Sequence, residues 1–223
     1  MKRVVAIDGP SGSGKSTISR MLAERLGFQF LDTGALYRAL GIYLDRKGVD
    51  HEDSDAALRS GIGVVNIELS GDKVLLGGED VSDIIRTPSA GHLASVFSAR
   101  RPVREYLFSL QRNAAAKNDI VAEGRDMTTV VFPDAWIKFF LDASVEERAR
   151  RRFQQLLEKG MDITMDQALA DVRDRDLRDS SRDIAPLKKS EDSILIDSTN
   201  ISISSVVEEM IRHLPAEINS KQP

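Results

Sequence analysis

The chain has 223 residues, of which 41% are hydrophobic, and its 31 basic and 35 acidic side chains give a formal net charge of −4. This length suits one α/β domain with one or two small insertions, and the apolar content excludes wholesale disorder. The acidic balance argues against a broad nucleic-acid-binding surface, and the absence of cysteine excludes disulfides and thiolate metal sites.

Targeting to or through a membrane is not expected. No apolar run approaches the roughly 18 residues of a membrane span, and the first apolar strand begins at Arg3, which leaves no room for a signal peptide. Three scattered histidines argue against a zinc site. We therefore expect a cytoplasmic protein that binds neither membrane nor nucleic acid, and we expect a monomer, although a homodimer stays open.

A glycine-rich motif follows the first expected strand, residues 3–8. Residues 9–16, GPSGSGKS, match the phosphate-binding pattern G-x-x-x-x-G-K-[ST], and an amphipathic helix over residues 17–26 follows. Such a loop turns successive N–H groups toward an anion at the start of a helix. Lys15 is placed to reach the β- and γ-phosphates, and the Ser16 hydroxyl suits Mg²⁺. The expected ATP-binding residues are Gly9, Pro10, Ser11, Gly12, Ser13, Gly14, Lys15, Ser16 and Thr17.

Strands and helices alternate through the next part of the chain. We expect a strand over residues 28–32, a helix over 33–47, a polar break over 48–60, and a helix that starts at Pro88 and another over 102–117. Residues 64–69 and 73–76, joined by a turn at 70–72, read as an antiparallel hairpin. The hairpin is expected to be an insertion, because the surrounding pattern is of strand–helix type.

The C-terminal half repeats the strand–helix alternation. Its expected strands are residues 119–123, 136–142 and 193–197, its expected helices are 145–159, 165–182 and 203–213, and a polar frayed tail follows Pro215. Apolar strands alternating with helices predict an α/β fold, with a parallel sheet flanked by helices as in P-loop NTPases.

Carboxylates end five of the expected strands. They are Asp8, Asp32, Glu123, Asp142 and Asp197. Ligands of open parallel sheets bind outside the carboxyl ends of the strands, so several of these side chains should gather near the phosphates. The sequence does not say which of them orders the water shell of Mg²⁺, and each alone also fits a strand-end or helix-start cap.

Arginine is concentrated on the two charged helices at 145–159 and 165–182. Arg148, Arg151 and Arg152 share one helix face, and a second face carries Arg175, Arg178, Asp179 and Arg182. Solvated helices with i,i+4 ion pairs explain this spacing. A mobile lid hinged at Gly160, which brings cations to a transferring phosphoryl group, explains it as well.

Two further arginines suit a phosphate monoester. Arg38 lies at a helix start, where a cation disfavours the helix dipole, and Arg125 lies in a tight loop, residues 124–126, at a strand end. A phosphate partner accounts for both positions.

Five motifs fall in order along the chain: GPSGSGKST at residues 9–17, DTGALYR at 32–38, EDVSDIIRT at 79–87, EGRDMTTVVFPDA at 123–135 and RDLRDSSR at 175–182. Together they resemble the bacterial cytidylate kinases, a family of nucleoside monophosphate kinases, over residues 3–213. The resemblance implies in-line transfer of the ATP γ-phosphoryl group to CMP or dCMP, with Mg²⁺, to give CDP or dCDP and ADP. It also implies a core domain of residues 1–40, 101–145 and 183–223, a CMP-binding insertion of 41–100, and a lid of 145–183.

The same resemblance implies the site residues. Lys15, Arg38, Arg125 and Arg182 would carry catalysis, and Arg148 and Arg152 would join the phosphate loop in binding ATP. The implied substrate-binding residues are Thr33, Tyr37, Arg38, Ser95, Arg104, Arg125, Asp126, Arg175, Asp179 and Arg182. Among these, Ser95, Arg104 and Asp126 would read the cytosine, and Asp179 the ribose.

One position departs from the expected pattern. Thr128 stands where the resemblance leads us to expect glycine. If that glycine served a positive φ or a close approach, Thr128 would strain the loop that carries Arg125 and Asp126.

Other functions of a phosphate loop were weighed against this one. A kinase with another acceptor, such as UMP or a small hydroxylated metabolite, remains the nearest alternative. A GTP-driven switch would need N-K-x-D to read guanine, which the chain lacks. A nucleotide-binding regulator could do without the acceptor arginines, and a mechanical ATPase would need an oligomer interface or a nucleic-acid surface.

Overall fold

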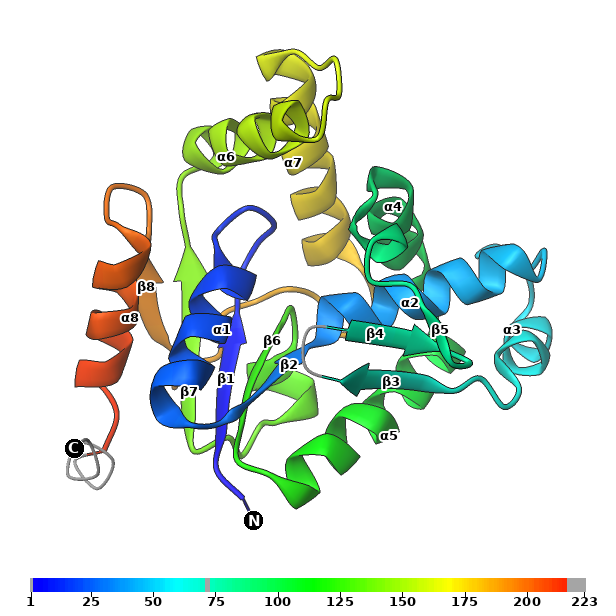
Figure 1. Cartoon of the computed structure of the whole chain (residues 1–223), viewed down its shortest axis with the longest axis horizontal. Helices are drawn as coiled ribbons and strands as arrows, with labels where there is room; N and C mark the ends of the chain where they lie inside the picture. Colours follow the sequence, from blue (N-terminus) through cyan, green and yellow to red (C-terminus); the bar gives the residue numbers. More distant parts are fainter. Residues whose placement is uncertain (1, 71–72, 216–223) are drawn as a thin grey trace. The chain divides into compact units, whose positions relative to one another are not determined.

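The structure is a computed structural model that describes residues 2–70 and 73–215 (Figure 1). It divides into two compact units, a first unit of Met1–Leu31 and Ala114–Pro223 and a second unit of Asp32–Asn113. The expected insertion, residues 41–100, lies within the second unit, and the expected lid, residues 145–183, lies within the first. The centre of the expected hairpin turn, residues 71–72, and the tail from residue 216 lie outside the described residues.

A five-stranded sheet with the order β2-β6-β1-β7-β8 forms the centre of the first unit. Its strands are β1 (Val4–Asp8), β2 (Gln29–Asp32), β6 (Ile120–Gly124), β7 (Ile137–Asp142) and β8 (Ile194–Asp197). β1 pairs in parallel with both β6 and β7, and β7 pairs in parallel with β8. The fold class predicted from the alternating pattern is therefore confirmed.

Two helices cover one face of this sheet. α1 (Lys15–Leu26) and α8 (Ile203–Arg212) pack their apolar residues on it (Figure 1). Side chains alternate along a strand, so Val5 and Ile7 of β1 face these helices, and Asp8 points to the opposite face. The phosphate-binding motif thus begins directly after a strand buried on both faces.

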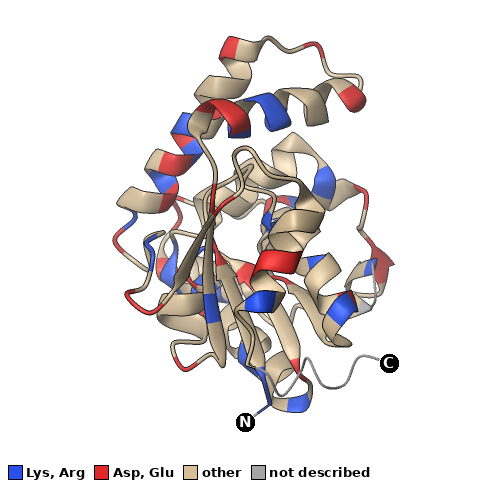
Figure 2. Cartoon of the chain, turned by 90° about the vertical axis from the view of Figure 1, so that its left-hand side faces the viewer, with Lys and Arg blue, Asp and Glu red and all other residues tan. Residues whose placement is uncertain are grey.

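Two charged helices, α6 (Val145–Glu158) and α7 (Met165–Ser181), also belong to the first unit. They pack against each other, and acidic and basic segments alternate along them at the top of Figure 2. α7 begins with a capping box, in which Thr164 accepts from the backbone N–H of Gln167 and the Gln167 side chain accepts from that of Thr164. Both helices lie where the sequence predicted them.

The second unit combines helices with a small antiparallel sheet. Its elements are α2 (Thr33–Arg46), α3 (Asp55–Ile62), β3 (Ile67–Ser70), β4 (Lys73–Leu76), β5 (Glu79–Asp80), a 3₁₀ turn (Ile84–Arg86), α4 (Pro88–Phe97) and the start of α5 (Arg101–Lys117). The hairpin is confirmed as β3 and β4, which pair antiparallel. Pro88 is the first residue of α4, as predicted, with Thr87 as its N-cap.

Three local features differ from the prediction or were missed. The stretch 48–60, expected as a polar break, contains most of α3: Ser54 caps that helix, and Leu58 and Ile62, four residues apart, bury its apolar side. A third strand, β5, extends the hairpin. Residues Met127–Val131 form a short π-helical turn, η2, directly after the Arg125 loop. The helix α3 was missed because its two buried residues, Leu58 and Ile62, give too weak a hydrophobic periodicity to predict a helix from the sequence.

No helix within residues 2–70 and 73–215 is both long enough and apolar enough to cross a membrane.

The core of the first unit predicts a contrast between two leucines on helices. Leu22 of α1 is fully buried and Leu177 of α7 is 66% exposed. Leu22→Ala should lower the free energy of unfolding by about 2–5 kcal/mol, because it leaves a cavity between helix and sheet. Leu177→Ala should change it by no more than about 0.5 kcal/mol. Urea unfolding of the two variants measures the difference, and equal losses would contradict the described packing.

Candidate active site

The phosphate loop takes a conformation that depends on glycine. Gly12 and Gly14 have φ values of +81° and +91°, in the left-handed region. A Cβ atom added at Gly9 would lie 2.0 Å from the carbonyl oxygen of Leu141 on β7, so the chain passes β7 at a distance that a side chain would block. Gly14 then leads directly into the first residue of α1, Lys15. The loop is therefore set between the end of β1 and the positive end of a helix.

Lys15 is folded into this loop. Its Nζ donates to the carbonyl oxygen of Pro10 at 2.6 Å and to Oγ of Ser13 at 3.3 Å, and the residue is 5% exposed. Burial, together with the positive charge of Arg125, lowers the pKa of Lys15 from 10.5 to about 7, although Glu123 and other nearby carboxylates act the other way. Its two hydrogen bonds go to uncharged oxygens, so a phosphate would be a stronger partner for the ammonium group.

Ser16 and Glu123 bring two oxygen donors together beside the loop. Oγ of Ser16 donates to Oε1 of Glu123 at 2.7 Å, and Glu123, at the end of β6, is 4% exposed. Of the five strand-end carboxylates, Glu123 is the one for which the structure gives a hydrogen bond to Ser16. Hydroxyl and carboxylate oxygens are the ligands that a Mg²⁺ ion prefers, so the pair fits this ion. From the sequence alone, any of the five strand-end carboxylates could have been the one beside Mg²⁺.

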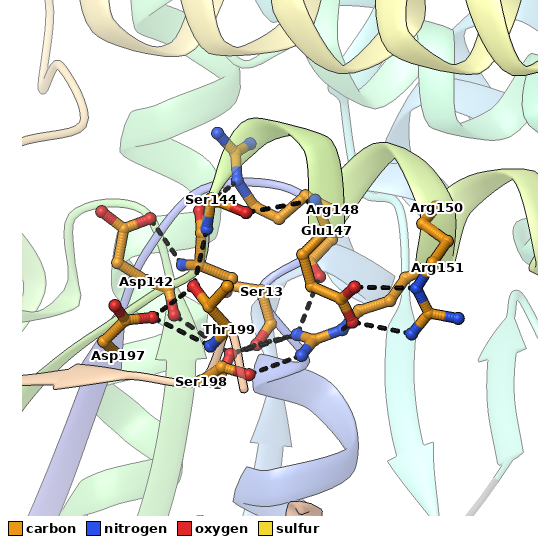
Figure 3. Close-up of polar contacts among 12 residues, drawn as sticks. Ser13, Asp142, Ser144, Glu147, Arg148, Arg150, Arg151, Asp197, Ser198 and Thr199 are labelled. Atoms are coloured by element: carbon orange, nitrogen blue, oxygen red, sulfur yellow. Dashed lines mark hydrogen bonds and ion pairs between the residues drawn. The ribbon is translucent and has the colours of Figure 1, made fainter. Parts of the chain in front are cut away.

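Two arginines of α6, Arg148 and Arg151, donate hydrogen bonds to carbonyl groups of the phosphate loop, and Figure 3 shows Arg151 beside Ser13 and Ser198. Arg151 donates to the carbonyl oxygens of Gly12 at 3.5 Å and Ser13 at 3.3 Å, and also to both oxygens of Ser198. Arg148, which is 4% exposed, donates to the carbonyl oxygen of Ser11 at 3.1 Å. The carbonyl groups of three loop residues are thus engaged by α6, which suits a loop whose amide groups bind an anion. Arg151 was noticed in the arginine cluster but was not assigned to the site.

Ion pairs of Arg148 and Arg152 join α6 to α7, and Arg175 forms a further pair within α7. Arg148 pairs with Asp176 at 2.7 Å, and Arg152 pairs with Asp171 at 2.9 Å. Arg175 reaches the same Asp171 at 3.3 Å. In this structure the three arginines expected at the nucleotides therefore bond carboxylates of α7, and their role toward ATP or CMP stays a prediction.

Arg125 and Asp179 form a partly buried ion pair between the loop after β6 and α7. Nε of Arg125 donates to Oδ2 of Asp179 at 2.7 Å. Burial would raise the pKa of the Asp179 carboxyl, but the charge and hydrogen bond of Arg125 outweigh it and hold this pKa below its usual value. Arg182, just beyond α7, donates to the carbonyl oxygen of Ala185 at 2.7 Å. The structure thus brings two of the predicted acceptor-binding residues into direct contact.

Asp8 anchors the loop that carries Arg125 and Asp126. Its carboxylate accepts from the backbone N–H of Met127 at 2.9 Å, and from the N–H and the hydroxyl of Thr128 at 2.8 and 2.7 Å. Burial raises the pKa of the Asp8 carboxyl to about 6, although these hydrogen bonds lower it. Ala185 is the one non-glycine residue with a positive φ in the described part of the chain, so the expected strain at Thr128 is wrong. A negative φ and a hydrogen-bonded hydroxyl suit threonine here.

The remaining predicted residues belong to the second unit. Thr33 and Arg38 lie in the first two turns of α2, and a Cβ atom added at Gly34 would lie 3.3 Å from Nη2 of Arg38, so the arginine folds back over the turn. Arg104 is 8% exposed, donates to the carbonyl oxygen of Ser98 at 3.2 Å, and has its guanidinium 5.9 Å from the ring centroid of Tyr37. Ser95 lies on α4, where its carbonyl oxygen accepts from the Ser98 hydroxyl. These are the donors expected to read a base, gathered in one unit.

Comparison with known proteins decides the family. The family model described as cytidylate kinase matches residues 5–216. The chain belongs to the cytidylate kinase family. It is 51% identical over 211 residues to a cytidylate kinase of Thermodesulfovibrio yellowstonii, covering 93% of this chain and 95% of the relative. It is 46% identical over 218 residues to a cytidylate kinase of Vibrio vulnificus, covering 96% of each chain.

Among solved structures the likeness is one of fold. An uncharacterized protein from Eubacterium ventriosum superimposes with a TM-score of 0.54 at 16% identity, covering 99% of this chain and 100% of the other. The prediction of a phosphotransferase of the cytidylate kinase family, acting with ATP on CMP or dCMP, is confirmed by the family relationship.

The environment of Lys15 predicts proton uptake when this kinase binds ATP. At about pH 8 the amine is mostly neutral in the free protein, because its pKa is about 7. A triphosphate in the loop adds negative charge beside it and raises this pKa, so Lys15 gains a proton. Titration calorimetry of Mg·ATP binding in buffers of different ionisation enthalpy should give close to one proton taken up. Lys15→Arg, charged throughout, should take up almost none, and an equal value in both proteins would contradict the lowered pKa.

Proposed function

We propose that this chain transfers the γ-phosphoryl group of Mg·ATP to CMP or dCMP through the residues assembled at the carboxyl end of its parallel sheet. The observation that carries the proposal is the buried Lys15 within a glycine-shaped loop, beside the Ser16–Glu123 pair, in a member of the cytidylate kinase family. Phosphoryl transfer needs positioned cations and donors and no covalent intermediate. These groups match that requirement.

The donor side of the reaction rests on the first unit. The phosphate loop, residues 9–17, would bind the ATP phosphates through its amide groups, and Lys15 would neutralise charge on the transferring group. Ser16 and Glu123 would hold Mg²⁺, directly or through water, and the ion would neutralise the phosphates. Arg148 and Arg152 are placed to move from α7 carboxylates to phosphate oxygens when the charged helices, the proposed lid of residues 145–183, close on ATP.

The acceptor side needs the pair of Arg125 and Asp179 to exchange partners. A phosphate monoester offers Arg125 two or more charged oxygens, against the one that Asp179 presents to Nε. Asp179 is then released toward the ribose hydroxyls, with Arg175 beside it on α7. We propose that Arg38 and Arg182 also bind the acceptor phosphate through their positive charges. Thr33 and Tyr37 would provide hydroxyl groups for further hydrogen bonds to the acceptor.

Base recognition follows from fixed donors and acceptors. Cytosine presents an amino donor and a ring-nitrogen acceptor where uracil presents the reverse. A carboxylate at Asp126 accepts only, and a guanidinium at Arg104 donates only, so both suit cytosine and oppose uracil. Ser95 can do either and would orient the base.

We further propose a cytoplasmic monomer with a core, a CMP-binding insertion of residues 41–100 and the lid. Binding of two small substrates, ATP and CMP or dCMP, accounts for all of the proposed site residues, so the proposal includes no protein, nucleic-acid or membrane partner.

Removal of the Lys15 charge tests the donor side. Lys15→Ala should lower kcat by roughly 30- to 1000-fold, since loss of such a contact costs about 2–4 kcal/mol in the transition state. Lys117→Ala, on an exposed lysine near the end of α5, is the matched control and should keep wild-type activity. A coupled assay of ADP release measures both variants. Near-normal turnover by a folded Lys15→Ala protein would refute the assignment.

A panel of nucleoside monophosphates tests the acceptor. Wild type should prefer CMP over UMP by roughly 30-fold or more in kcat/KM, from two mismatched groups at about 1–3 kcal/mol each. Asp126→Ala should lower CMP activity and reduce that ratio, whereas Asp134→Ala, on an exposed carboxylate eight residues later, should change neither. Equal use of UMP and CMP by wild type, or an unchanged ratio in Asp126→Ala, would overturn the base assignment.

A further inference from the structure

Asp8 is a fully buried carboxylate with an unusual set of partners. It is 0% exposed and receives three hydrogen bonds, all from two consecutive residues, Met127 and Thr128. Its positive neighbours, Lys15 and Arg125, act through space, and Asp126 adds a like charge. A buried carboxylate is costly unless hydrogen bonds replace its water. The three donors therefore determine where this carboxylate and their own backbone lie.

Two functional segments meet at this carboxylate. Asp8 directly precedes Gly9, where the phosphate loop begins, and Met127 directly follows Asp126, the residue proposed to read the base. The phosphate loop has supports of its own, since Arg151 donates to two of its carbonyl groups and Gly9 lies against Leu141. The loop of residues 124–128 has the ion pair of Arg125, which an acceptor phosphate would break. The Asp8 carboxylate is thus an attachment of this loop that would remain when the acceptor is bound.

Thr128 supplies two of the three hydrogen bonds to Asp8. Its N–H donates at 2.8 Å and its hydroxyl at 2.7 Å, both to Oδ2. A glycine in this position would keep the first of these bonds and lose the second. A β-branched side chain has few χ1 rotamers, so the hydroxyl holds the backbone to which it belongs.

We propose that the Thr128 hydroxyl is a positioning group for the acceptor nucleotide: it fixes the backbone of residues 124–128 to Asp8 and so holds Arg125 and Asp126 in place. The proposal rests on the proposed function for the part played by Arg125 and Asp126. Thr128 is not among the residues that we propose to contact either substrate. Its effect should therefore appear in the use of the acceptor and not in the binding of ATP.

The chain offers a matched control at the next residue. The hydroxyl oxygen of Thr129 is buried and has no hydrogen-bond partner in the described part of the chain. Thr129→Val changes the same atoms as Thr128→Val in the same turn without removing a hydrogen bond. If Thr128→Val and Thr129→Val impaired the use of CMP equally, the cause would be the changed packing of the turn and not the lost hydrogen bond.

The test compares Thr128→Val, Thr128→Ala, Thr128→Ser and Thr129→Val with wild type. The two variants without a hydroxyl at position 128 should raise the KM for CMP roughly 10- to 150-fold, the size expected for one hydrogen bond to a charged group. Thr128→Ser, which restores the hydroxyl, and Thr129→Val should stay within about twofold of wild type. The Kd for Mg·ATP should be unchanged in all four. Thr128→Ala keeps the test valid if valine prevents folding.

Hydrogen exchange separates this proposal from the proposed function. In free protein, peptides that cover residues 124–131 should exchange faster in Thr128→Val than in Thr128→Ser, and peptides that cover the phosphate loop should not differ. Faster exchange in a protein that fails to phosphorylate CMP would support the attachment and refute the function. Unchanged exchange and an unchanged KM for CMP, or a rise in KM that Thr128→Ser does not reverse, would overturn the role of the Thr128 hydroxyl.

Discussion

The phosphate loop is the constraint on which the rest of the site depends. Its amide groups can face an anion only if its carbonyl groups find donors elsewhere, and Arg148 and Arg151 of α6 provide them. The close passage of Gly9 along β7 fixes the other side. The loop is therefore shaped before any nucleotide binds, by contacts from a helix whose Arg148 lies 137 residues beyond Ser11 in the chain. This links the charged helices to ATP binding through the backbone as well as through their charges.

Charges at the carboxyl end of the sheet are compensated by one another. Lys15 bonds a carbonyl group, Arg125 pairs with Asp179, and Arg148 and Arg152 pair with carboxylates of α7. Substrates that bring phosphate groups would replace these internal partners, so binding exchanges one set of charge-assisted bonds for another. Such exchange would keep these arginines paired with anionic groups in both states. In the proposed mechanism it would also let each nucleotide rearrange the helices that carry the arginines.

Sequence reasoning succeeded where a local pattern carries the structure. The strand before Gly9, the helix after it, the hairpin of β3 and β4, and Pro88 at the start of α4 all follow from spacing and turn chemistry. It failed at α3, where only Leu58 and Ile62 mark the buried side, and at Thr128, where strain was expected and a hydrogen bond is found. The hydrogen-bond partner of Thr128, Asp8, lies 120 residues away in the chain, so no local sequence pattern predicts this contact.

The sequence alone determined the chemistry of this protein. A glycine-rich loop with Lys15 and Ser16, placed between a strand and a helix, indicates a phosphate ligand, because glycine dihedral angles and an N-terminal helix dipole are local properties. The family motifs added the acceptor. Only the tertiary structure decided which carboxylate accompanies Ser16, which arginines hold the loop from outside, and what Asp8 does at the end of β1. Each of these is a contact between residues distant in sequence. Parallel strands bring such residues to one edge of the sheet, but the hydrophobic periodicity of each segment does not predict these contacts.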